Sequence, residues 1–90
     1  MYAIAETRES LHLPGVISPA QTRGARNMLG WTQAELAVKA DVGLSTVKKL
    51  ESGQNVRPAF IECVQRAIEA AGVRPINADE WGGEGVRFVK

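Results

Sequence analysis

Residues 31–53, WTQAELAVKADVGLSTVKKLESG, have the pattern of two short helices joined by a tight turn. Thr32 is placed to cap the first helix, and Glu35 lies three residues later, where its side chain can bond back to the Thr32 amide. The turn falls at 41–43. Beyond it, apolar residues recur three positions apart while the lysines lie elsewhere on the helix. The spacing therefore predicts a second helix, over 44–52, with one apolar side and one cationic side.

The two helices must pack against each other, which restricts the residue types at the positions where they touch. A small residue is needed where the helices cross, and Ala37 occupies that position. The neighbouring positions must be apolar to hold the crossing. The requirement is met at Leu36, Ala37, Ala40, Val42, Val47 and Leu50.

This stretch resembles the helix-turn-helix of phage repressor and Cro-type proteins, the xenobiotic-response-element class. The resemblance extends over 18–72 and rests on the capping box, the small crossing residue and a terminal Glu-x-Gly at fixed offsets. One departure is Asp41, where the family usually has Gly because the turn needs a positive φ, which Asp tolerates. The resemblance implies a mainly α fold, a lambda-repressor-like bundle of four short helices containing the helix-turn-helix.

The flanking helices carry their own start and stop signals. Ser18 and Gln21 form a second potential capping box around Pro19, and Gly30 is a suitable C-terminal stop. Pro58 is suited to the first position of the last helix, which we expect to close the core with an apolar stripe. The stripe consists of Phe60, Cys63, Val64, Ala67, Ile68 and Ala71, and we interpret Cys63 as a buried small hydrophobe.

The two ends of the chain lie outside this domain. Residues 73–90 contain two β-prone segments around a turn-forming stretch, which predicts a C-terminal two-stranded β-hairpin. An isolated hairpin is marginal in water, so it must pack on the helical body or on a second chain. We expect it to form a homodimer interface through Trp81, Val86, Phe88 and Val89. Residues 1–17 form an N-terminal arm that is either a short helix or partly disordered.

Composition limits the functions that remain. Ninety residues allow one small domain, and the net charge of +1 with a pI near 7.9 does not by itself indicate a nucleic-acid binder. The single histidine, His12, and the single cysteine lie at unrelated positions, and no catalytic motif is present. We therefore expect no enzyme activity, no metal and no cofactor. With no membrane-spanning run and no secretory signal, the expected location is the cytoplasm.

The resemblance implies a DNA-binding site built around helix 44–52, whose N-terminal end enters the major groove. The residues placed to contact bases are Leu44, Ser45, Lys48 and Lys49. The residues placed to contact phosphates are Gln33, Ser52, Gln54, Asn55, Arg57 and Arg23. For the latter set, a solvated polar surface is the alternative. The resemblance also implies an ion pair between Arg26 and Glu51, the alternative being two solvated charges.

Two functions follow from these observations. The first is a sequence-specific DNA-binding transcriptional regulator that binds a double-stranded operator as a homodimer. The alternative is a small protein-binding module, antiactivator-like or antitoxin-like, that uses the same fold to bind a protein partner. The near-neutral net charge keeps this alternative open.

Overall fold

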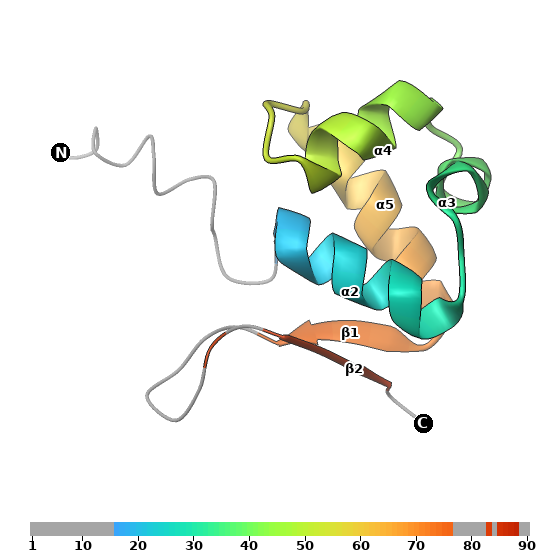
Figure 1. The fold of residues 1–90 in the computed structure, drawn as a ribbon, viewed down its shortest axis with the longest axis vertical. Coiled ribbons are helices and arrows are strands. Elements are labelled where there is room, and N and C mark those ends of the chain that lie inside the picture. The colour runs from blue at the N-terminus through green and yellow to red at the C-terminus, as the bar shows by residue number, and fades with distance from the viewer. Residues whose placement is uncertain (1–15, 77–82, 84, 89–90) are drawn as a thin grey trace, which may run out of the picture.

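The computed structural model describes residues 16–76, 83 and 85–88. Within them, four helices precede a two-stranded antiparallel sheet (Figure 1). The elements are α2 (Pro19–Leu29), α3 (Gln33–Ala40), α4 (Leu44–Glu51), α5 (Pro58–Ala70), β1 (Val73–Ile76) and β2 (Gly85–Phe88). The predicted mainly α bundle with a C-terminal hairpin is thus confirmed. The arm up to residue 15, His12, Trp81 and Val89 lie outside the described residues.

Two capping boxes begin α2 and α3 as the sequence predicts. Gln21 N donates to Ser18 Oγ at 3.1 Å, and Ser18 N donates to Gln21 Oε1 at 2.9 Å. The same exchange joins Thr32 and Glu35, at 3.0 and 2.8 Å. Each box satisfies backbone donors that the first helical turn leaves without a partner, so both helix starts are fixed locally.

The turn between α3 and α4 depends on Asp41, which adopts the left-handed conformation with φ 58° and ψ 45°. The Asp41 amide donates to Val38 O, and the next amide, Val42 N, donates to Ala37 O at 3.0 Å. These bonds end α3 and turn the chain toward α4. Among the described residues, Asp41 is the only residue other than glycine with a positive φ.

The core lies between the helices and extends to both ends of the described chain. Its buried apolar residues are Ile17, Ala25, Leu36, Ala37, Ala40, Val47, Leu50, Val64, Ile68 and Val73. Ile17 is only 2% exposed, although its sequence position falls within the expected arm 1–17. Its amide donates to Gln65 Oε1 at 2.9 Å, which ties this segment to α5.

The apolar stripe of α5 enters the core only in part. Val64 and Ile68 are fully buried and lie one turn apart, so they define the face of α5 that packs on the other helices. Phe60 is 39% exposed and Cys63 is half-buried, so neither occupies the fully buried position that we expected. Ala71, at the other end of the predicted stripe, is also exposed.

The hairpin packs against α2 of its own chain, on the side away from α4 (Figure 1). Val73 is fully buried, and Val86 Cγ2 lies close to Gly24, 3.4 Å from where a Cβ would stand. The buried Gln21 amide donates to the carbonyl oxygens of Ile76 and Gly85 at 2.8 and 3.0 Å. The tail is therefore attached to the helical body by both apolar contacts and hydrogen bonds.

Candidate nucleic-acid interface

Helix α4 has one buried side and one exposed side. Val47 and Leu50 are buried against the other helices, whereas the predicted base-contacting residues are all exposed. Those residues are Leu44, Ser45, Lys48 and Lys49, and at 100° per residue they occupy an arc of about 140°. The structure therefore places all four on one exposed face of a single helix.

The N-terminal end of α4 has free hydrogen-bonding capacity, and the nearest carboxylate before it, Asp41, belongs to the turn. Its N-cap is Gly43, which offers no side-chain cap, and its first turn contains no acidic residue. The backbone amides at this end carry the partial positive charge of the helix dipole. Lys48 and Lys49 add two formal charges in the following turn, so this helix is suited to approach an anionic surface.

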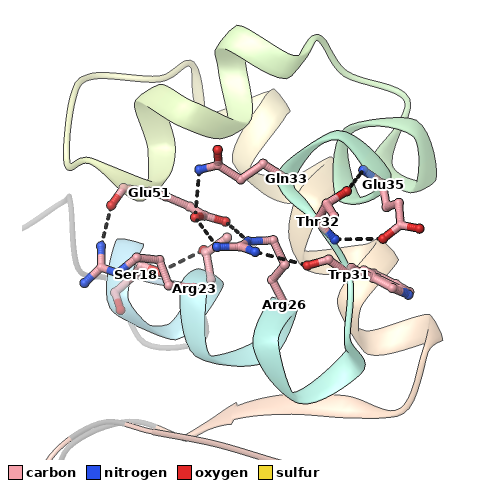
Figure 2. A network of polar contacts seen from close by, with 9 residues as sticks. Ser18, Arg23, Arg26, Trp31, Thr32, Gln33, Glu35 and Glu51 are labelled. Carbon is pink, nitrogen blue, oxygen red and sulfur yellow. Dashed lines mark hydrogen bonds and ion pairs between the residues drawn. The ribbon is translucent and has the colours of Figure 1, made fainter.

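The C-terminal end of α4 is held by a buried carboxylate (Figure 2). Glu51 is only 4% exposed, and its Oε2 accepts from Arg26 Nε at 2.8 Å. Its Oε1 accepts from Arg26 Nη2 at 3.1 Å, so the pair is bidentate. Arg26 Nη1 also donates to the Trp31 carbonyl at 3.0 Å. One arginine thus connects α2, the segment before α3 and the end of α4.

Two residues that we expected to contact phosphates also belong to this network. Gln33 Nε2 donates to Glu51 Oε1 at 3.1 Å, and Arg23 Nη1 donates to the backbone carbonyl of Glu51 (Figure 2). The Gln33 amide has a second N–H that this bond does not use. No local sequence pattern indicates either contact, because they join residues 18 and 28 positions apart in the chain.

The remaining predicted phosphate-contacting residues lie in the exposed loop after α4. Ser52 Oγ donates to Lys49 O at 3.0 Å, and Gln54 Nε2 donates to Ser52 Oγ at 3.0 Å. Asn55 and Arg57 are exposed in the same loop. The structure therefore brings these four residues together beyond one end of α4, while Gln33 begins the neighbouring helix.

The described residues contain no group of three or more histidine, cysteine or acidic side chains that could hold a metal ion. None of the described helices combines the length and the apolar character that crossing a membrane requires. Cys63 is a free thiol. In this part of the chain, polar side chains gather around α4 and its supporting network.

Comparison with known proteins agrees with this geometry. Residues 23–62 match the family model described as helix-turn-helix, a segment that begins within α2, contains α3 and α4, and ends within α5. None of the curated proteins matches the chain. The matched segment includes the Arg26–Glu51 pair and every candidate base-contacting residue. Residues 23–62 form a helix-turn-helix domain of the phage repressor and Cro type, a domain of DNA-binding regulators.

Proposed function

We propose that the protein is a sequence-specific transcriptional regulator that inserts α4 into the major groove of an operator. The observation that carries this proposal is the exposed face of α4, where lysines follow an uncapped, acid-free helix N-terminus. The helix behind that face is fixed at its other end through Glu51. A rigid cationic helix of this kind is the element by which helix-turn-helix proteins contact base edges.

The exposed residues of α4 have different roles in this proposal. Lys49 reaches guanine O6 and N7, and Lys48 lies beside it on the same exposed face. Ser45 exchanges a hydrogen bond with a base edge, and Leu44 contacts a thymine methyl. Because none of these side chains is an amide or guanidinium group, contacts around α4 must contribute to positioning the helix.

The proposed phosphate contacts come from segments that flank the C-terminal end of α4. On one side, Gln33 at the start of α3 donates its second amide N–H and its backbone amide to a phosphate. On the other side, the loop after α4 contributes Ser52, Gln54, Asn55 and Arg57, while Arg23 lies beside the same end of the helix. Gln33 then links a phosphate directly to Glu51.

We further propose that two copies pair through their hairpins and bind two half-sites one helical turn apart. In the described sheet, β2 pairs with β1 alone, so its other edge is open to a second strand. Phe88 is 53% exposed at the end of β2, which leaves apolar surface for a partner to cover. Val86 is partly buried on its own chain, so Phe88 contributes more to this interface.

The alternative function is a protein-binding module on the same fold. Val38 on α3 is 80% exposed, the largest exposed fraction among the large apolar residues of the described chain. Ala34, Glu35 and Lys39 lie beside it on the same helix. In this alternative a partner protein covers Val38. We place either activity in the cytoplasm.

A salt titration of DNA binding separates the two functions. For a subunit that neutralises about 4 to 6 phosphates, the logarithm of the binding constant falls with the logarithm of the salt concentration, with a slope of roughly −4 to −5. Arg57→Gln, at a proposed phosphate contact, should make that slope shallower by about 1, whereas Arg66→Gln, in an exposed pair with Glu62, should leave it unchanged. A flat response, or no DNA binding at any salt concentration, would favour the protein-binding module.

A further inference from the structure

The outer face of the hairpin presents two arginines directly opposite each other. In the antiparallel register Arg74 pairs with Arg87, and both are exposed. Directly paired residues of an antiparallel sheet have their side chains on the same face, about 4.5 to 5.5 Å apart at Cβ. No acidic side chain of the described residues forms an ion pair with either arginine. The two positive charges therefore share one solvent-facing site.

This placement costs stability unless an anion binds there. Like charges at directly opposed strand positions repel, and a solvent-facing position accepts a neutral or acidic residue equally well. The hairpin cannot easily turn the arginines away, because Val73 is fully buried on the other face and Gln21 bonds to two hairpin carbonyls. The packing of the hairpin thus keeps the two guanidinium groups together.

An apolar surface continues from the arginine pair on the same face. Ile76 is 38% exposed, and as the residue two positions from Arg74 it lies on that face, opposite Gly85. Because Gly85 has no side chain, one flank of Ile76 is open. A guanidinium pair beside an open apolar side chain matches a ligand that has both carboxylates and an apolar group.

The position of this face separates it from the DNA-binding helix. The hairpin packs on the side of α2 away from α4 (Figure 1). A duplex bound at α4 would therefore leave the arginine pair uncovered. The face is also distinct from the open edge of β2 that we assign to dimerisation, since side chains leave a strand perpendicular to its hydrogen-bonding edge.

We propose that the outer face formed by Arg74, Arg87 and Ile76 binds a short acidic segment of a partner protein. Carboxylates of that segment accept charge-assisted hydrogen bonds from both guanidinium groups, and an apolar side chain packs on Ile76. Charge complementarity identifies the occupant as anionic. The apolar neighbour favours an acidic peptide over the uniformly charged backbone of a nucleic acid.

The test is binding of the fluorescent peptide Asp-Glu-Leu-Asp-Glu to the full chain, with Asn-Gln-Leu-Asn-Gln as the neutral probe. We expect salt-sensitive binding of the acidic peptide, reduced about tenfold in the double variant Arg74→Gln and Arg87→Gln. Arg66→Gln on α5 removes an exposed arginine elsewhere and should leave binding unchanged. An equal loss in Arg66→Gln, or no preference for the acidic peptide, would overturn the proposal.

Two further measurements complete the test. In urea unfolding, the double variant should be at least as stable as the parent, because the repulsion between the arginines is gone. A loss of peptide binding is then a loss of the site and not of the fold, and a markedly unstable variant would contradict the repulsion that we infer. The second measurement uses a chain in which Lys48→Gln and Lys49→Gln weaken DNA binding through α4. If adding Arg74→Gln and Arg87→Gln to this chain abolishes the binding of a random duplex, the occupant is nucleic acid and the proposal is wrong.

Discussion

Arg26 on α2 and Glu51 at the end of α4 form a bidentate ion pair, with nitrogen–oxygen distances of 2.8 and 3.1 Å. The carboxylate side chain is 3% exposed and the guanidinium side chain 17% exposed. Burial makes the carboxylate dependent on its partners, because a buried charge without partners is strongly unfavourable. The pair therefore sets the position of α4 more than it adds net stability.

We expect Glu51→Ala to lower the free energy of unfolding by about 3 kcal/mol, since Arg26 then loses its buried partner. Replacing both residues should cost less than the sum of the single replacements. Urea unfolding of the four proteins in this cycle measures the coupling. The exposed pair of Glu62 and Arg66, at 2.7 Å, is a matched control and should show a coupling below about 0.5 kcal/mol. Strict additivity for the buried pair would contradict the assigned role.

Lys49→Ala should weaken binding to the specific operator by about 1 to 3 kcal/mol, with a smaller effect on random DNA, because a base contact is lost. Fluorescence anisotropy with both duplexes measures the difference. Lys39→Ala removes an exposed lysine from α3, whose Nζ lies 5.4 Å from the centre of the Trp31 ring, and serves as the control. Equal losses on the two duplexes would make Lys49 a phosphate contact.

Gln33→Ala should weaken binding by a similar factor on all sequences, because the contact that it loses is to a phosphate. The structure adds that the same side chain bonds to Glu51. Gln33→Glu should weaken binding further on all sequences, since the glutamate repels both the phosphate and the buried carboxylate. A selective loss of discrimination between operators in the alanine variant would mean that Gln33 acts mainly by positioning α4.

Apart from the Arg26–Glu51 pair, which the family resemblance implied, the features that the sequence predicted correctly depend on residues a few positions apart. The boxes at Ser18 and Thr32 bring together groups three residues apart, and the turn at Asp41 depends on one residue's tolerance of a positive φ. The hydrogen bonds from Gln21 to the hairpin span 55 and 64 positions, and no local pattern indicates them. The exposure of Phe60 was missed because periodicity identifies an apolar face but not how far its neighbours cover it.

Gly24→Ala should stabilise the protein by about 0.5 to 1 kcal/mol, because Gly is costly inside a helix and the added Cβ would make an ordinary contact, 3.4 Å from Val86. Gly30→Ala makes the same chemical change at φ 72° and should destabilise the protein by about 1 kcal/mol through strain alone. Thermal or urea unfolding measures both. Destabilisation by Gly24→Ala would mean that the hairpin packs more tightly on α2 than the structure has it.

The last prediction concerns the dimer that we propose through the hairpin. Removing the whole tail is a poor test, because Val73 belongs to the core and its loss would unfold the helical body. Phe88→Ser changes only a 53% exposed side chain at the open strand. Covering the exposed half of this ring is worth roughly half of the ~1.5 to 3 kcal/mol of a fully buried side chain, and a two-fold dimer covers two such rings, so the substitution should raise the dimer dissociation constant about tenfold.

Sedimentation at several protein concentrations measures that constant. Ile76→Ser is the matched control, because Ile76 is 38% exposed on the outer face of the same hairpin, away from the edge that pairs. We expect Phe88→Ser to shift the protein to monomer and to weaken operator binding, while a single half-site is bound as before. Two outcomes would show that the open edge of β2 is not the interface. The parent chain would be monomeric at every concentration, or the dimer would be sensitive only to Ile76→Ser.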